Sequence, residues 1–264
     1  MIDLETILSN SLHRSSWQIE KSPDGLSKET YIAKHDGLSV FLKLDGNTPV
    51  LTRLATLQIA PKVLASGVID GISFLIQEYF SGVYPDTTWF NDNIEQVATV
   101  LKTYHQDTEL NQILQRENKV KTIDTWLDEF DNHPDGSVDL LRSKANGLKR
   151  MPVQPVHADP NRKNFLVHGA EIRIVDWDDS TLADPLLDTA LLAYWYLPQT
   201  KWDAFLKSVG IEITADTMER FHWFVAAQSL HVSLWFAKRG NKTEQDKYLE
   251  DFTTAIKHRP NPKR

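Results

Sequence analysis

The hydrophobic pattern changes its period near residue 80, and this change constrains the fold more than any other feature of the 264-residue sequence. Before that point, apolar residues tend to alternate with polar ones, which is typical of strands. After it, they recur every three or four positions, which is typical of helices. We therefore expect an α+β protein with a β-rich N-terminal lobe at residues 1–80 and a larger, mostly helical C-terminal lobe at residues 81–264.

The first lobe is predicted to hold five strands and one helix. Asp36-Gly37 and Asp70-Gly71 favour tight turns, so the strands beside them should form hairpins of an antiparallel sheet. In the second lobe, Asn91 is predicted to cap a helix whose apolar face runs from Ile94 to Tyr104. The expected strands are residues 17–20, 30–33, 39–44, 62–68 and 72–78; the expected helices are 49–59, 121–130, 137–149 and several within 185–257.

Composition excludes several classes of protein. The chain has no cysteine, so disulfides, thiolate metal sites and cysteine nucleophiles are ruled out. Its 29 basic and 36 acidic residues give a net charge of −7, which disfavours binding to nucleic acid. No apolar run approaches the ~18 residues of a membrane span, and the acidic, amphipathic first residues do not resemble a signal peptide. We expect a cytoplasmic protein with neither nucleic acid nor membrane as partner.

One irregular polar segment interrupts the helical pattern between residues 151 and 180. It contains His157, Asp159 and Asn164, then two short apolar runs, and then Asp176 and Asp178. If the apolar runs form a hairpin, the chain returns and Asp176 emerges beside Asn164. Amide and carboxylate oxygens are ligands that Mg²⁺ prefers, and Asp159 would remain available to accept a proton from an attacking hydroxyl. This arrangement matches the template for phosphoryl transfer.

The segment resembles the aminoglycoside phosphotransferase and choline kinase family, the small-molecule branch of the protein-kinase-like fold. That family carries H-x-D-x-x-x-x-N followed by D-W-D or D-W-E, and Asp184 to Asp188 are similar to its D-P-x-x-D run. The resemblance implies a bilobal kinase-like fold, ATP and Mg²⁺ as cofactors, and transfer of phosphate to a hydroxyl of a small molecule. It implies that Asp159 is the catalytic base and that Asn164, Asp176 and Asp178 form the metal site.

The resemblance also implies a nucleotide site in the first lobe. Lys43 is the one cation on an apolar strand and resembles the lysine that pairs with ATP phosphates. The loop at residues 24–30 would cover the phosphates, with the Ser27 hydroxyl among its donors. Glu78 and Phe80 resemble the hinge between the lobes, where backbone groups pair with adenine.

One departure from the kinase template leaves an alternative open. The template pairs the strand lysine with a glutamate on the following helix, but residues 46–60 contain neither Asp nor Glu. Lys43 then pairs with Asp176, with the nucleotide or with an acid elsewhere. The alternative function is a nucleotide-binding pseudokinase or regulatory module without turnover.

The sequence says less about the acceptor and about the residues that support the site. Six acidic residues within 124–139 are consistent with a cationic acceptor or with a solvated helix face. The late aromatic residues, among them Trp195 and Phe236, could enclose a cation or simply form the core of a helix bundle. We expect His157 to brace the catalytic loop, and Asp184 and Asp188 to cap or brace the helix that follows.

Overall fold

The computed structural model describes residues 3–22, 29–130 and 136–259. The chain divides into two compact units: residues 1–84 with 163–179, and residues 85–162 with 180–264. The segment 163–179 thus packs with the first unit, although it follows Asp159 closely in the sequence. The division into functional lobes at residue 80 stays a prediction.

The first unit is built on a five-stranded antiparallel sheet with the strand order β1-β2-β3-β5-β4. Asp36 and Gly37 both have positive φ, as do Asp70 and Gly71, so the two predicted tight turns are present. All five predicted strands are confirmed, with shifts of one or two residues at their ends. Their bounds are β1 Gln18–Lys21, β2 Thr30–His35, β3 Leu38–Leu44, β4 Val63–Ile69 and β5 Ile72–Glu78.

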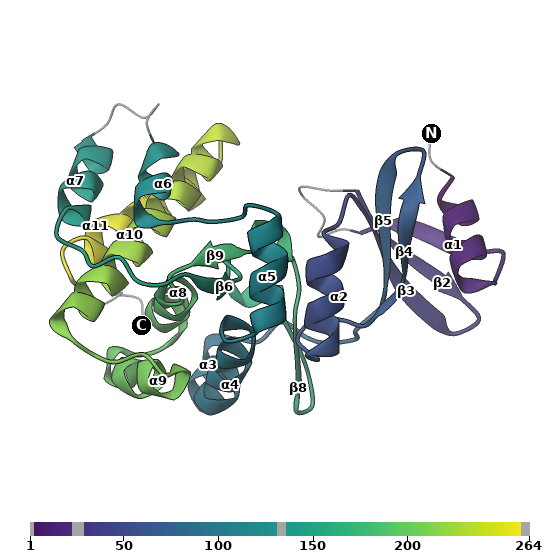
Figure 1. Ribbon diagram of the computed structural model, residues 1–264, viewed down its shortest axis with the longest axis horizontal. Coiled ribbons are helices and arrows are strands. Elements are labelled where there is room, and N and C mark those ends of the chain that lie inside the picture. Colours follow the sequence, from purple (N-terminus) through teal and green to yellow (C-terminus); the bar gives the residue numbers. More distant parts are fainter. Residues whose placement is uncertain (1–2, 23–28, 131–135, 260–264) are drawn as a thin grey trace. The chain divides into compact units, whose positions relative to one another are not determined.

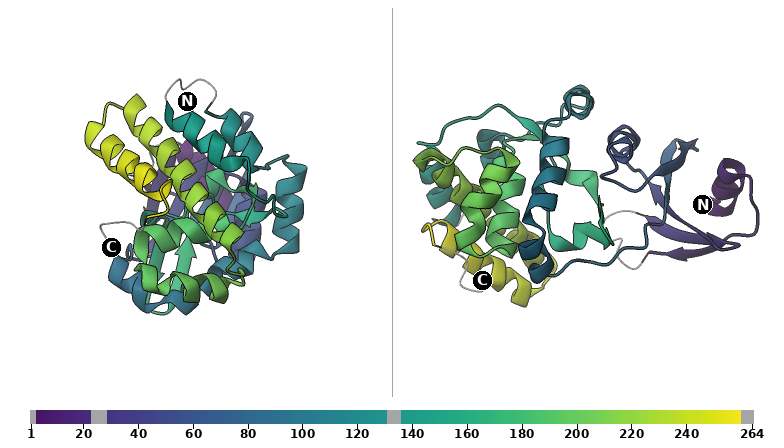
Figure 2. Two further views of the ribbon diagram at one scale, coloured as in Figure 1. Left: turned by 90° about the vertical axis from the view of Figure 1, so that its left-hand side faces the viewer. Right: turned by 90° about the horizontal axis from the view of Figure 1, so that it is seen from below.

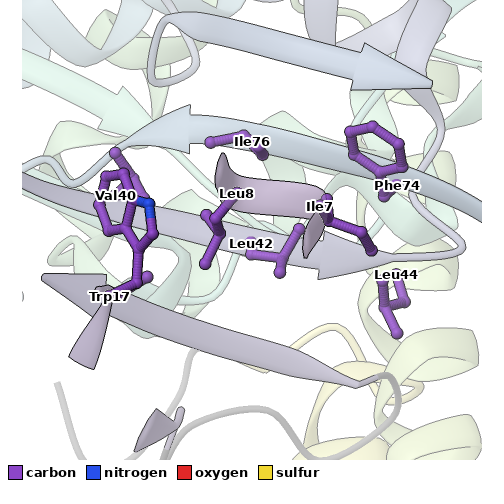
Figure 3. Packing of buried hydrophobic residues seen from close by; sticks show 9 residues of the cluster. Ile7, Leu8, Trp17, Val40, Leu42, Leu44, Phe74 and Ile76 are labelled. Atoms are coloured by element: carbon purple, nitrogen blue, oxygen red, sulfur yellow. The ribbon is translucent and has the colours of Figure 1, made fainter. Parts of the chain in front are cut away.

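A helix that the sequence analysis did not predict covers one face of this sheet. Helix α1 (Leu4–Leu12) begins at Asp3, whose side chain accepts hydrogen bonds from the backbone N–H groups of Glu5 and Thr6. Its residues Ile7 and Leu8 are buried against the strands (Figure 3). The hydrophobic cluster on this face comprises Ile7, Leu8, Trp17, Ala33, Val40, Leu42, Leu44, Phe74 and Ile76.

The opposite face of the sheet carries helix α2 (Thr48–Thr56), so the sheet lies between two helices (Figure 1). Asn47 caps α2 by accepting a hydrogen bond from the N–H of Val50. The hairpin of β7 (Phe165–His168) and β8 (Glu171–Ile174) also belongs to this unit. The Ile174 N–H donates to the carbonyl of Ile59, which follows α2, at 2.6 Å.

The second unit is mostly helical. Asn91 does not cap its first long helix: Asp86 caps α3 through the N–H of Trp89, and α4 begins only after Asn93. The pair β6 (Gln154–Val156) and β9 (Thr181–Ala183) flanks the loop that carries Asp159. The helices are α3 Thr87–Asp92, α4 Ile94–His105, α5 Thr108–Arg116, α6 Ile123–Asp128, α7 Gly136–Ala145, α8 Leu186–Tyr196, α9 Trp202–Val209, α10 Ala215–Lys238 and α11 Lys242–Ala255.

Helices α10 and α11 lie side by side at the C-terminal end of the chain (Figure 2). Trp223 and Phe224 of α10 are buried and pack against Trp126, so these two aromatic residues belong to the core. Within the residues that the structure describes, no helix combines the length and the apolar character needed to cross a bilayer.

Candidate active site

Lys43 is buried on the α2 side of the sheet, and its charge is met by two carboxylates. Only 7% of the residue is exposed, because it lies between strands β2 and β5. Its Nζ donates to Oδ1 of Asp178 at 2.7 Å and lies 3.9 Å from Oδ1 of Asp176. Helix α2 carries no acidic residue, so Asp178 occupies the role of the acid partner that the sequence analysis left open.

The two aspartates are placed by the β7–β8 hairpin. Val175, the residue before Asp176, donates its N–H to the carbonyl of Asn164 at 2.8 Å. The hairpin therefore brings Asn164 and Asp176, 12 positions apart in the sequence, to the same end of one element. Asp176 has φ of 59°, a left-handed conformation that costs a non-glycine residue roughly 1–2 kcal/mol. Such strain is more often found at functional sites than elsewhere.

The donor set formed by Asn164, Asp176 and Asp178 fits Mg²⁺. It offers one amide oxygen and several carboxylate oxygens. The two carboxylates and the single ammonium of Lys43 together carry a formal charge of −1. In the described part of the chain, no group of three or more His, Cys, Asp or Glu residues could hold a metal by itself. Mg²⁺ commonly binds through one or two carboxylates together with substrate phosphates, so this set suits a metal shared with a nucleotide.

The predicted hinge residues also lie in the first unit. Glu78 ends β5, and its Oε1 accepts the N–H of Lys62 at 2.9 Å. Phe80 packs edge-on to His168, and the guanidinium of Arg173 lies 5.1 Å from the centre of its ring. The fourth predicted nucleotide-binding residue, Ser27, lies outside the described residues.

Asp159 belongs to the second unit and is held in a tight loop. Its carboxylate Oδ2 accepts a hydrogen bond from the side-chain amide of Asn161 at 2.9 Å. Its N–H donates to Nδ1 of His157 at 3.2 Å, so this ring nitrogen acts as the acceptor. His157 is fully buried, so this contact fixes the direction of the loop immediately before Asp159.

Asp188 binds the backbone of the same loop. It is fully buried on α8, where it accepts the backbone N–H of His157 at 2.7 Å and that of Ala158 at 2.9 Å. Its Oδ2 also accepts the Tyr104 hydroxyl at 2.7 Å and lies 3.3 Å from Nε2 of His105. Ala158 has φ of 69°, so these bonds hold a strained residue in place. The expectation that Asp188 serves its own helix is therefore incomplete.

The ionised form of Asp188 is favoured despite its burial. Burial alone raises the pKa of a carboxyl group, but the hydrogen bond and charge of His105, with His157 and Tyr104, hold the pKa of Asp188 below its ordinary value. Burial, and then the charge and hydrogen bond of Asp188, raise the pKa of the Tyr104 hydroxyl well above its ordinary value. The ionised carboxylate of Asp188 therefore faces the loop that carries Asp159.

Two tyrosines of the second unit, Tyr196 and Tyr248, lie near the loop that carries Asp159. Tyr196, at the end of α8, accepts the N–H of Arg162 through its hydroxyl at 2.9 Å. Tyr248 of α11 packs against Trp195 and stacks on Phe236. Burial, then the neighbouring Tyr196, Glu244 and Asp159, raises the pKa of the Tyr248 hydroxyl, so this residue lies within electrostatic range of Asp159.

Two members of the acidic stretch at 124–139 are already neutralised. Asp124 accepts two hydrogen bonds from the guanidinium of Arg150, at 2.5 and 3.2 Å. Glu129 pairs with Lys121 at 3.0 Å. These contacts favour the solvated-surface interpretation for the two carboxylates over a role in binding a cation.

The sequence analysis did not predict four residues that support the loop carrying Asp159: Tyr104, His105, Asn161 and Tyr196. Tyr104 occupies an apolar position in the pattern of its helix. Such a position predicts burial but gives no sign of a polar contact. Asn161, two residues after Asp159, offered a local signal, because asparagine side chains commonly bond to neighbouring groups in turns.

These features define a kinase-like protein. A five-stranded sheet carries a buried lysine that is paired to an aspartate, and a mostly helical unit with an Asp-bearing loop follows it in the sequence. The model of the phosphotransferase enzyme family matches residues 7–224. The chain belongs to this family.

Solved structures confirm the kinase-like fold. Choline kinase LicA from Streptococcus pneumoniae is 18% identical, with 97% of this chain and 96% of that chain covered at a TM-score of 0.68. A choline/ethanolamine kinase family protein from Mesorhizobium loti is 19% identical, with coverage of 93% and 89% and a TM-score of 0.63. Spectinomycin phosphotransferase, solved with ADP and spectinomycin, is 16% identical, with coverage of 98% and 94% and a TM-score of 0.68.

Proposed function

We propose that this protein is an ATP- and Mg²⁺-dependent phosphotransferase whose acceptor is a hydroxyl group of a small molecule. The observation that carries the proposal is the placement of Lys43, Asn164, Asp176 and Asp178 together in the first unit. A buried ammonium beside hard oxygen donors is suited to a nucleoside triphosphate and its metal. Membership of the phosphotransferase enzyme family supports the same chemistry.

Asp159 would serve as the base. It is partly exposed, and its loop is fixed by His157 and Asp188, so its carboxylate is held ready to orient and deprotonate an acceptor hydroxyl. Asn164 lies five residues further along the chain, so the two Cα atoms are at most ~18 Å apart. In this proposal Lys43 binds the phosphates, the hinge at Glu78 and Phe80 binds the base of the nucleotide, and Ser27 contributes a phosphate donor.

Asn164, Asp176 and Asp178 would hold Mg²⁺, which supplies charge neutralisation on the phosphates when it is bound. Asp178 would serve the metal and Lys43 together. The missing acidic residue on α2 favoured a nucleotide-binding module without turnover, but the pairing of Lys43 with Asp178 weakens that argument.

An acceptor screen tests the proposal. ADP release would be followed with ATP or GTP against choline, ethanolamine, aminoglycosides, thiamine, homoserine and sugars, in the presence of Mg²⁺ and again with the metal chelated. We expect at least one hydroxyl compound to stimulate ADP release in a metal-dependent manner, with a matching phosphorylated product. Tight binding of ATP without transfer to any acceptor would support the non-catalytic alternative, and metal-independent transfer would contradict the metal site.

A further inference from the structure

Arg162 is an exposed cation between the proposed base and the proposed metal site. It lies three residues after Asp159 and two residues before Asn164. Among the residues that the structure describes, its guanidinium makes neither a hydrogen bond nor an ion pair. By contrast, the guanidinium of Arg220 meets two carboxylates. The charge of Arg162 is therefore available to an anion that is not part of the described chain.

The backbone that carries Arg162 is fixed, although its side chain is not engaged. The N–H of Asn161 donates to the carbonyl of Asp159 at 2.8 Å, and the N–H of Arg162 donates to the hydroxyl of Tyr196 at 2.9 Å. The Tyr196 ring stacks on Phe90, with 4.9 Å between the ring centres. Because the backbone is already ordered, less conformational freedom is lost when the guanidinium binds a ligand.

The neighbouring carboxylate of Asp159 does not pair with Arg162. Its Oδ2 accepts the neutral side-chain amide of Asn161 at 2.9 Å, and no ion pair joins it to Arg162 in the described chain. An ion pair would stabilise the charged carboxylate and make it a weaker base. The loop therefore leaves the carboxylate of Asp159 able to act as a base and the guanidinium able to bind an anion.

The residues proposed to act in phosphoryl transfer carry an excess of negative charge. Asp159, Asp176 and Asp178 supply three carboxylates, and Lys43 supplies a single ammonium, so their formal charge is −2. The phosphates of a nucleotide add further negative charge, and Mg²⁺ offsets only part of it. A second cation beside the transferred group would lower the electrostatic cost of bringing these charges together.

Chain length alone limits how far Arg162 can lie from the transferred group. Its Cα is at most ~11 Å from that of Asp159 and at most ~7 Å from that of Asn164. In phosphoryl transfer, the γ-phosphorus lies between the acceptor oxygen, which faces the base, and the oxygens that the metal binds. A phosphoryl group held between residues 159 and 164 is therefore within reach of an arginine at residue 162.

We propose that the guanidinium of Arg162 binds the γ-phosphoryl group of the nucleotide; this inference rests on the phosphotransferase function proposed above. Arginine presents its N–H donors in a rigid fork that matches phosphate oxygens, and it stays protonated. In the transfer, the acceptor oxygen forms a bond to the γ-phosphorus, and the bond from that phosphorus to the oxygen that leaves with ADP breaks. The acceptor proton passes to Asp159, while Arg162 stabilises the charge on the equatorial oxygens and exchanges no proton.

A comparison of Mg·ATP and Mg·ADP binding tests this contact without turnover. Because ADP lacks the γ-phosphoryl group, Arg162→Met should weaken Mg·ATP binding about tenfold in calorimetry and leave Mg·ADP binding within about twofold. Arg162→Lys keeps the charge but loses the fork, so it should recover part of the affinity. The matched control is Arg116→Met, since Arg116 is exposed at the end of α5 and has no ion pair with the described residues; it should bind both nucleotides as the wild type does.

Steady-state kinetics with the acceptor found in the screen supply a second readout. Arg162→Met should lower kcat by at least about 10²-fold and leave the KM of the acceptor within about threefold, because the guanidinium contacts the phosphoryl group and not the acceptor. Arg162→Lys should lie between the two. The Tm of Arg162→Met should stay within about 2 °C of the wild type, because methionine keeps the backbone N–H that binds Tyr196.

Three results would overturn the proposal: equal weakening of Mg·ATP and Mg·ADP by Arg162→Met, unchanged Mg·ATP affinity, or transfer at the wild-type rate. Equal weakening would show that Arg162 acts on the nucleotide only through its general charge or through the loop. A wild-type protein that binds Mg·ATP but phosphorylates no acceptor would overturn the proposed function instead. In that case the comparison of ATP with ADP would still decide whether Arg162 contacts the γ-phosphoryl group.

Discussion

Replacement of Asp188 by asparagine should remove the main support of the loop that carries Asp159. Four donors converge on this carboxylate: two backbone N–H groups, the Tyr104 hydroxyl and His105. A hydrogen bond to a charged group contributes about 1.5–3 kcal/mol. The amide of Asp188→Asn keeps one accepting oxygen and turns an N–H₂ group toward at least one of these donors, so at least one of the four bonds is lost and the others lose their charged acceptor.

The expected loss is therefore about 3–5 kcal/mol in the free energy of unfolding. This is a large fraction of the roughly 5–15 kcal/mol that stabilises a typical domain. Urea denaturation at pH 7 followed by circular dichroism measures it, with Asp92→Asn as the matched control. Asp92 is exposed at the end of α3, and the same change there should stay within about 0.5 kcal/mol.

The strained Ala158 supplies a second check on the same reasoning. Glycine adopts the left-handed conformation of this residue without steric cost, so Ala158→Gly should recover about 1 kcal/mol in the Asp188→Asn background. A loss below 1 kcal/mol for Asp188→Asn, or no recovery with glycine, would show that Asp188 does not hold the loop in the way described.

Three further changes test separate parts of the structure. Lys43→Met should weaken Mg·ATP binding about tenfold or more in calorimetry, because the ammonium beside Asp178 is lost; unchanged affinity would contradict a phosphate role. Gly67→Val should cost about 1–3 kcal/mol in urea denaturation, because a Cβ there lies 2.9 Å from the Phe74 ring, and a neutral effect would show that the ring moves freely. Burial, followed by the nearby His258, lowers the pKa of His222 from 6.5 to about 4, so the unfolded state binds the proton first and stability falls as pH drops from about 6.5 to 4. The full effect on the free energy of unfolding is about 3 kcal/mol. Between pH 7 and pH 4, this free energy should fall less for His222→Asn than for the wild type, and equal decreases would refute the assignment.

The sheet could be predicted from local signals, whereas much of what surrounds it could not. The turns Asp36-Gly37 and Asp70-Gly71 are encoded by adjacent residues, so the hairpins β2–β3 and β4–β5 followed from short-range pattern, whereas the pairing of β3 with β5 did not. Helix α1 was missed because the amphipathic start of the chain was read only for targeting. Asn91 was misassigned as a cap because several polar residues precede the helical period, and propensity alone does not choose among them.

The candidate site residues could be proposed from the sequence because their spacing is short, but the residues that support their loop could not. Asp159 and Asn164 lie within six residues, and a hairpin brings Asp176 next to Asn164. Asp188 contacts a loop 30 residues earlier in the chain and two residues more than 80 positions away. Local sequence carries no signal for such distant hydrogen bonds, so a capping role was the natural expectation.

Turnover and nucleotide binding in Asp159→Ala, measured on the same preparation, test the central claim most directly. If Asp159 is the base, phosphoryl transfer to the acceptor found in the screen falls by at least about 10²-fold, while calorimetry gives nearly wild-type affinity for Mg·ATP, because the residues proposed to bind the nucleotide and the metal lie in the other unit. Transfer at the wild-type rate in this variant would contradict the proposed mechanism.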